Sequence, residues 1–310
     1  MMTLRYGIFM ALTMGFLWII YDATNHILAE IACDIGNNHH QMGHFYLANE
    51  QFKQAVKYAP WEPRYQLELA KNYHQLANTS PENRDQWVHL ALETYDALIQ
   101  KNALYPWYYF YMGTLYHAQY TSNPTNTTYQ DQALASFKLA THTDPNNALF
   151  TEIYADALYT YGKLALAETY YTITLSYDKD LVSAHIGLAK TYIKQQQPQR
   201  AIDYYEDVLL YIESQRDAPP HLSSNDSLHE TMKHFNAIPL HLIDIYMTQP
   251  DQNALDRAWE LIQALPNTSQ KYEKMMAYYE SVGQDSLAQA LYHRLNPHPY
   301  TPRVDRRPTP

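Results

Sequence analysis

The chain has 310 residues, a formal net charge of −10 and one cysteine, Cys33. The acidic balance excludes the broad basic surface with which proteins hold nucleic-acid phosphates, and a single cysteine excludes an internal disulfide framework. Glycine is scarce, at 8 residues, while Ala, Leu, Tyr and Gln dominate the middle of the chain, a composition that favours helices over sheets.

The first predicted element is an apolar helix, because no charged residue occurs from Tyr6 to Tyr21. Its length of about 24 Å is short of the roughly 30 Å core of a bilayer, but Leu4 extends it. We predict a signal-anchor or transmembrane helix within residues 1–23 that enters the membrane through residues 4–21, with the N-terminus cytoplasmic and the remainder extracytoplasmic. A cleaved signal peptide, leaving a secreted or periplasmic form, and a buried core helix of a cytosolic protein are the alternatives.

A repeat of 34 residues follows the apolar segment. Ala155 aligns with Ala189, and Ala133, Ala167 and Ala201 recur at the same interval. Aromatic residues recur in step with the alanines. Small residues at fixed positions allow two helices to approach closely, and aromatic side chains fill the remaining space. The period therefore predicts stacked helical hairpins.

These residues resemble the pattern of the tetratricopeptide repeat (TPR) family over roughly residues 24–298. The resemblance implies an all-α, right-handed superhelical solenoid of about six or seven helix–turn–helix repeats. Residues that match the family's small, aromatic and proline positions are Gly36, Gly43, Ala48, Phe52, Ala55, Pro60, Gly113, Tyr116, Ala133, Phe137, Ala140, Pro145, Gly162, Ala167, Tyr171, Ala201, Tyr205, Gly283 and Ala288.

Departures from the period predict how the array is divided. Repeats 1–5 occupy residues 24–213, with polar, turn-rich insertions near 74–90 and 117–132 between the two helices of repeats 2 and 3. A Pro/Ser-rich loop at 214–227 precedes degenerate repeats 6 and 7 at 228–298, and residues 299–310 are expected to be a disordered tail. The consecutive insertions also resemble, more loosely, the repeat tails of O-antigen-ligase-like bacterial membrane proteins.

The sequence predicts no catalytic residue and no cofactor, because it lacks a G-x-S-x-G motif, a Gly-rich phosphate loop and H-E-x-x-H. His39, His40 and His44 lie around a predicted turn, so we expect a polar turn there and no metal site. Cys33 has no evident activating cluster and is expected to be a structural thiol.

The resemblance implies that the first helix of each repeat lines a concave groove that binds a protein or peptide partner. The candidate partner-binding residues are Arg64, Lys71, His74, Trp107, Phe110, Thr114, His117, Glu152, Asp156, Tyr159, Lys190 and Lys194. The alternative for each is that it is merely solvated or packs on a neighbouring turn.

Three functions remain open on these grounds. The first is a non-catalytic scaffold for protein–protein interactions at a membrane, on the extracytoplasmic side of a bacterial inner membrane. The second is an accessory subunit in cell-surface polysaccharide assembly that binds glycan or a glycosyltransferase. The third is a cytosolic TPR adaptor.

Overall fold

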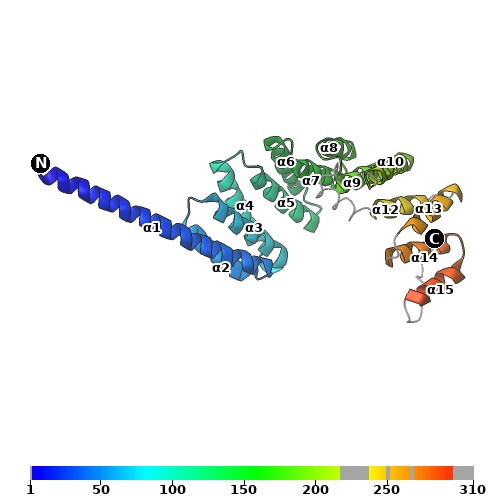
Figure 1. The fold of residues 1–310 in the computed structure, drawn as a ribbon, viewed down its shortest axis with the longest axis horizontal. Helices are drawn as coiled ribbons and strands as arrows, with labels where there is room; N and C mark the ends of the chain where they lie inside the picture. Colours follow the sequence, from blue (N-terminus) through cyan, green and yellow to red (C-terminus); the bar gives the residue numbers. More distant parts are fainter. Residues whose placement is uncertain (1, 217–236, 249–251, 266–268, 296–310) are drawn as a thin grey trace. The chain divides into compact units, whose positions relative to one another are not determined.

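The computed structural model describes all residues except 1, 217–236, 249–251, 266–268 and 296–310. This described part is all-α (Figure 1). Its helices are α1 (Met2–Gln41), α2 (Phe45–Tyr58), α3 (Pro63–Thr79), the short 3-10 helix η1 (Pro81–Asn83), α4 (Arg84–Lys101), α5 (Pro106–Ser122), α6 (Thr127–Thr143), α7 (Ala148–Thr160), α8 (Leu164–Tyr177), α9 (Val182–Lys194), α10 (Pro198–Arg216), α12 (Ala237–Met247), α13 (Gln252–Ala264), α14 (Ser269–Ser281) and α15 (Asp285–Leu295).

The chain divides into two compact units, residues 1–162 and residues 163–310. In the N-terminal unit α1 packs on α2, α3 on α4 and α5 on α6, and each pair contacts the next. In the C-terminal unit α9 packs on α8 and α10, α12 on α13, and α14 on α15. The helices therefore form consecutive hairpins within each unit, as the 34-residue period predicts.

Glycine is required where paired helices come closest. A Cβ atom on Gly36 of α1 would lie 2.8 Å from the ring of Phe52 on α2, and one on Gly113 of α5 would lie 2.7 Å from the ring of Phe137 on α6. Real Cβ atoms do not approach a ring so closely. Each aromatic ring thus fills the space that the missing side chain leaves, and the two helices of the hairpin lock together.

A left-handed residue ends the first helix of several repeats. Gly43, Gly162 and Gly283 have φ values of +75°, +74° and +72°, and Gln196 occupies the equivalent position of repeat 5 with φ of 63°. The N–H of Gln197, three residues past the end of α9, donates to the carbonyl of Tyr192 at 2.9 Å. This is the hydrogen bond of a Schellman cap, which satisfies a carbonyl at the helix end.

The inserted residues of repeats 2 and 3 lie mostly in helices, which corrects the prediction of inserted turns near 74–90 and 117–132. Only Ser80 and η1 separate α3 from α4, and only residues 123–126 separate α5 from α6. At the position where Gly43, Gly162, Gln196 and Gly283 end the first helix of other repeats, these two have Ala77 and Tyr120. Both residue types continue a helix readily, so the insertions lengthen the helices.

Within the described part of the chain, no helix combines the length and the apolar character needed to cross a bilayer. The predicted membrane segment at 4–21 includes positions 4–9 and 11, whose side chains fall outside that part. Most of the predicted loop at 214–227 and all of the predicted tail at 299–310 also lie outside the described residues.

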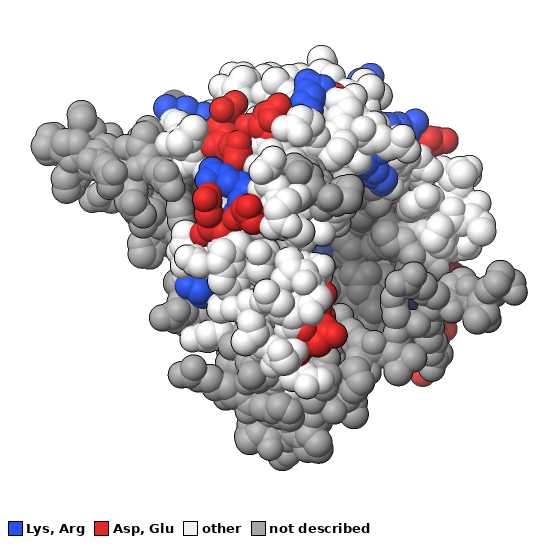
Figure 2. Space-filling view, turned by 90° about the vertical axis from the view of Figure 1, so that its right-hand side faces the viewer, with Lys and Arg blue, Asp and Glu red and all other residues white. Residues whose placement is uncertain are grey.

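Charged side chains of both signs lie next to one another on the face shown in Figure 2, in small groups separated by uncharged surface. Opposite charges also form ion pairs in the C-terminal unit. Arg200 lies 2.7 Å from Glu168, and Arg257 lies 2.8 Å from Glu260 and 3.3 Å from Glu206. These pairs neutralise each other locally, and each such exposed pair contributes at most about 1 kcal/mol to stability.

We expect Gly113→Ala to destabilise the protein by about 1–3 kcal/mol, because the added methyl group overlaps the Phe137 ring and forces α5 and α6 apart. Thermal unfolding followed by circular dichroism measures the effect. Gly15→Ala is the matched control, since a Cβ atom there meets nothing within 4 Å. Equal unfolding midpoints for Gly113→Ala and the wild type would contradict the close approach.

We expect Gln196→Gly to stabilise the protein by about 1 kcal/mol, because glycine adopts a positive φ without the steric cost of a Cβ atom. The neighbouring Gln195 has φ of −77°, so Gln195→Gly should lower stability instead. Chemical denaturation of both variants tests the pair. The explanation fails if the two substitutions change stability in the same direction.

Candidate partner-binding surface

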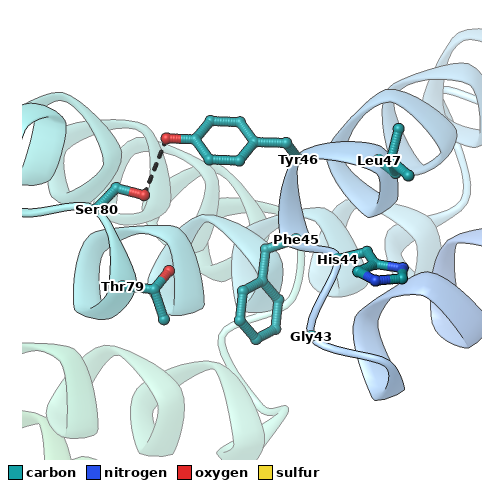
Figure 3. Close-up of a pocket in the computed structure, with 7 residues that line it drawn as sticks. All are labelled: Gly43, His44, Phe45, Tyr46, Leu47, Thr79 and Ser80. Atoms are coloured by element: carbon teal, nitrogen blue, oxygen red, sulfur yellow. Dashed lines mark hydrogen bonds between the residues drawn. The ribbon is translucent and has the colours of Figure 1, made fainter.

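A pocket of about 430 Å³ lies at the turn between α1 and α2, next to the end of α3 (Figure 3). Apolar atoms dominate its lining, which comes from Gly43, His44, Phe45, Tyr46, Leu47, Thr79 and Ser80. The Tyr46 hydroxyl donates a hydrogen bond to Ser80 Oγ at 2.9 Å across it. Sequence reasoning missed this pocket. The sequence feature that could have indicated the pocket is the insertion that lengthens α3. Thr79 and Ser80 lie beyond the point where the first helix of other repeats ends.

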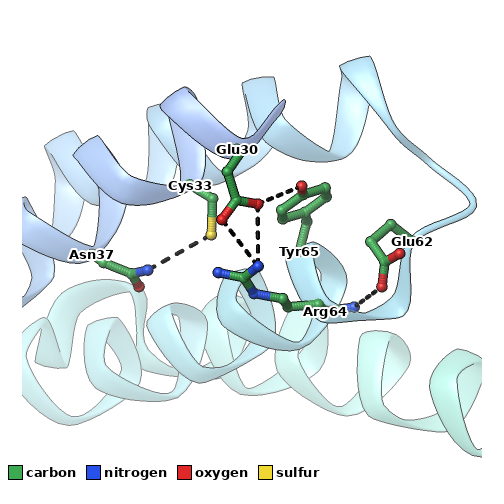
Figure 4. Close-up of polar contacts among 6 residues, drawn as sticks. All are labelled: Glu30, Cys33, Asn37, Glu62, Arg64 and Tyr65. Atoms are coloured by element: carbon green, nitrogen blue, oxygen red, sulfur yellow. Dashed lines mark hydrogen bonds and ion pairs between the residues drawn. The ribbon is translucent and has the colours of Figure 1, made fainter. Parts of the chain in front are cut away.

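The predicted groove residues of the N-terminal unit belong to a series of contacts that link α1, α3, α5 and α7. We call this series the helix ladder. Its first contact joins α1 to α3, where Arg64 Nη1 lies 3.0 and 3.1 Å from the two carboxylate oxygens of Glu30 (Figure 4). The Tyr65 hydroxyl donates to the same carboxylate at 2.8 Å. Glu62 caps α3 by accepting from the backbone N–H of Arg64 at 3.3 Å.

Electrostatics at this first contact hold Glu30 ionised. The hydrogen bond from Tyr65, followed by the Arg64 guanidinium, lowers the pKa of Glu30 although partial burial opposes the shift. Burial and the same hydrogen bond raise the pKa of Tyr65 to about 12. Next to them, burial raises the pKa of the Cys33 thiol to about 11, so the thiolate is disfavoured. The buried Cys33 sulfur accepts a hydrogen bond from Asn37 Nδ2 at 3.7 Å.

The second contact of the ladder joins α3 to α5. The Lys71 ammonium lies 5.5 Å from the centre of the Tyr111 ring and 2.8 Å from a carboxylate oxygen of Glu68. Tyr111 in turn stacks on the buried Tyr95 at 6.3 Å. Lys71 thus combines a cation–π contact with an ion pair. The side chains of Lys71 and Glu68 are both partly exposed. This arrangement presents a cation that a carboxylate or an aromatic side chain of a partner could contact.

The third contact joins α5 to α7 through aromatic rings. Trp107 lies 5.1 Å from Phe150, edge to face, and Phe110 lies 5.9 Å from the same ring. Phe150 is 1% exposed, whereas Trp107 and Phe110 are half-buried. The structure therefore brings these two predicted groove residues together, and much of their surface is used to join successive repeats. Thr114, one turn further along α5, donates to the carbonyl of Tyr111 at 2.8 Å.

The histidines of the predicted groove are neutral groups. Burial lowers the pKa of His74 to about 4, and burial also lowers the pKa of His117 although Asp156 opposes that shift. His117 Nδ1 lies 2.8 Å from the Tyr161 hydroxyl, just past the end of α7. A neutral imidazole can either donate or accept a hydrogen bond, so this contact extends the ladder from α5 to α7.

The remaining candidates are divided between the two units. Glu152, Asp156 and Tyr159 lie on α7 of the N-terminal unit, where Asp156 is exposed and the other two are half-buried. Lys190 and Lys194 are exposed on α9, in the C-terminal unit. The surface that can be described as one piece therefore runs from Arg64 to Tyr159.

The histidines around the first turn serve the packing of α1, α2 and α3. His40 Nδ1 lies 2.9 Å from the Oδ1 atom of the buried Asn72, whose amide donates to the carbonyl of Phe45 at 2.9 Å. His39 and His44 rings lie 6.1 Å apart. Among the residues that the structure describes, no three His, Cys, Asp or Glu side chains are grouped as a metal site requires.

Solved structures provide the comparison with known proteins. A tetratricopeptide repeat protein from Parabacteroides merdae aligns with a TM-score of 0.52 at 14% identity, over 89% of this chain and 95% of that one. PilF of Pseudomonas aeruginosa aligns with a TM-score of 0.51 at 14% identity, over 81% of this chain and 98% of that one. The thermophilic TPR protein TTC0263 of Thermus thermophilus gives 0.46 at 20% identity, over 68% and 99%.

This chain has the TPR fold. No family model matches the sequence, and no curated protein sequence matches it significantly. Neither of the first two neighbours supports the looser likeness to O-antigen-ligase tails.

We expect the TPR array to lose stability as the pH falls from about 6.5 towards 4. In that interval His74 stays neutral in the folded protein, whereas in the unfolded chain it takes up a proton. The unfolded state therefore binds more protons, and the free energy of unfolding decreases. His117, His185 and His241 have lowered pKa values as well and act in the same direction.

His74→Gln should flatten part of this pH dependence, by a few degrees in the thermal midpoint over the interval. Differential scanning calorimetry between pH 7.5 and 4.5 compares it with the wild type. His89→Gln is the control, because His89 is exposed on α4. Identical pH profiles for wild type and His74→Gln would show that His74 is not held neutral.

Proposed function

We propose that the chain is a scaffold that binds a protein or peptide partner along the helix ladder of its N-terminal unit. The observation that carries the proposal is the alternation of charged and aromatic groups on successive first helices, from the Glu30–Arg64 pair through Lys71 on Tyr111 to Trp107. Such a surface suits an extended peptide or a partner helix, because ionic groups set the register and aromatic rings supply apolar contact.

Partial exposure makes the ion pairs of the ladder exchangeable. The Arg64 and Glu30 side chains are 53% and 39% exposed, and those of Lys71 and Glu68 are 30% and 22% exposed. Exposed pairs of this kind contribute at most about 1 kcal/mol to stability. A carboxylate from a partner can therefore replace Glu68 at Lys71, or Glu30 at Arg64, at small cost to the fold.

The double variant Arg64→Ala with Lys71→Ala tests the ladder as a binding surface. We expect capture of partner proteins from the native lysate, quantified by mass spectrometry, to fall at least about tenfold, since each lost charge-assisted contact costs about 1.5–3 kcal/mol. The thermal midpoint should change little. Lys57→Ala on α2 is the control, because Lys57 is exposed on the second helix of its hairpin. Equal capture by the double variant and the wild type would reject the ladder.

We further propose that the start of α1 attaches the chain to a membrane. Within α1, large apolar side chains are exposed at every described position from Phe16 to Tyr21, with Trp18 66% exposed. This half of the helix extends beyond the hairpins of its unit (Figure 1). Water contact with so much apolar surface is unfavourable, and insertion into lipid relieves it. In the orientation that we propose, the N-terminus lies in the cytoplasm and the repeats lie outside.

Vesicle flotation measures the proposed attachment. The full chain should float with phosphatidylcholine vesicles, and Leu17→Lys with Ile20→Lys should reduce flotation because charges are costly in the bilayer core. The same two substitutions leave the hairpins intact. A wild-type chain that stays in the aqueous fraction would contradict membrane attachment without affecting the ladder proposal.

A further inference from the structure

The start of α3 lies beside α1 in the N-terminal unit. Arg64 reaches Glu30 at 3.0 Å (Figure 4), and the Tyr65 ring lies 6.3 Å from the ring of His26, one turn earlier on α1. The α2–α3 turn, residues 59–62, comes directly before these contacts. It therefore lies next to α1 near His26, and the part of α1 before His26 extends beyond it.

The α4–α5 turn, residues 102–105, lies on the same side of the unit. Lys101, the last residue of α4, donates from Nζ to the Oε1 atom of Gln66 in the first turn of α3 at 2.9 Å. The end of α4 thus lies beside the start of α3, as in an antiparallel hairpin. We call the α2–α3 and α4–α5 turns together the anchor edge, because the first part of α1 extends from this side of the unit (Figure 1).

The anchor edge exposes large apolar side chains. Trp61 in the α2–α3 turn is 53% exposed, Leu104 in the α4–α5 turn is 80% exposed, and its neighbour Tyr105 is exposed as well. The next turn on this side, residues 144–147 between α6 and α7, consists of Asp, Pro and two Asn. The turns with exposed apolar residues are therefore the two that lie nearest to α1.

Basic side chains accompany these apolar residues. Lys57 and Lys101 are exposed in the last turns of α2 and α4, which lead into the two turns. The one acidic residue within the turns, Glu62, is half-buried and accepts from the backbone N–H of Arg64 at 3.3 Å. Trp and Tyr favour the headgroup layer of a bilayer, and lysines are attracted to anionic lipids. This combination of side chains suits a phospholipid surface.

We propose that the anchor edge lies in the headgroup layer of the phospholipid bilayer that takes up the start of α1. This placement rests on the membrane attachment proposed above and adds which side of the repeats faces the lipid. Tyr21, the last residue of the exposed apolar run, precedes His26 by five residues of continuous helix. Five residues rise only about 8 Å, and the headgroup layer is about 5–8 Å thick. A helical link of this length keeps Trp61 at the membrane surface.

A fluorescent label measures where the anchor edge lies. Leu104→Cys carries an environment-sensitive dye, in the full chain bound to phosphatidylcholine vesicles that contain phosphatidylglycerol. We expect its emission to shift to shorter wavelength, and a nitroxide on the lipid headgroup to quench it. Glu82→Cys in η1 is the matched control, because it is exposed at the other end of α3, about 25 Å away, and should show neither change. The native Cys33 is buried, so wild type treated with the dye supplies the blank.

Moving the anchor edge away from the lipid provides a second measurement. Seven residues of Ala and Gln inserted after Thr24 lengthen α1 by about 10 Å and by nearly two full turns. The start of α1 can still enter the bilayer, so flotation should be unchanged. Quenching of the label on Leu104→Cys should be lost, because the anchor edge no longer reaches the headgroups.

The possible results distinguish the anchor edge from membrane attachment itself. The anchor edge is overturned, and attachment stands, if the chain floats with the vesicles but the labels on Leu104→Cys and Glu82→Cys respond alike. Equal quenching of the Leu104→Cys label with and without the insertion has the same consequence. A chain that stays in the aqueous fraction overturns both attachment and the anchor edge.

Discussion

The close approach of two helices at a glycine is the contact on which the rest of this structure depends. At Gly36 and Gly113 the partner helix brings an aromatic ring to within a distance that no side chain permits. This fixes the separation of the helices in each hairpin, and the hairpin geometry fixes where the first helix of the next repeat can lie. The distances of the helix ladder follow, because Arg64 reaches Glu30 only when α1 and α3 are held at that spacing.

The period of 34 residues made the hairpins and their glycine contacts predictable, because small and aromatic residues at fixed positions indicate which helix surfaces pack together. The insertions of repeats 2 and 3 were predicted as turns, because their polar residues indicate turns by composition, whereas most of them lie in helices. The decisive signal was a missing residue. Repeats 2 and 3 have Ala77 and Tyr120 where a residue with positive φ, Gly43, Gly162, Gln196 or Gly283, ends the first helix of other repeats, and a helix continues until something stops it. The pocket beside Ser80 exists because α3 continues.

The candidate surface was only partly predictable for a different reason. The repeat frame placed Arg64, Lys71, Trp107 and Phe110 on one face, but it could not state how much of each side chain neighbouring repeats use. That depends on contacts such as Trp107 on Phe150, which join residues 43 positions apart and require the offset between repeats. Arg64 and Lys71 end in charged groups that reach past these contacts. In Trp107 and Phe110, by contrast, much of the side-chain surface is buried in contacts between repeats.

In an array of repeats, every apolar face is buried by a neighbouring repeat except the faces at the two ends. Each internal repeat covers the apolar face of the one that follows, so Tyr65 and Leu69 are buried without any special feature. The first repeat has the same face and no described neighbour to cover it. Terminal repeats of soluble arrays commonly carry polar residues there. Here Ile31 and Ile35 are exposed, on a long helix that exposes other apolar residues such as Ile27. Because a polar substitution at either position would cost the fold little, the apolar residues are best explained by a contact that lies outside the single chain.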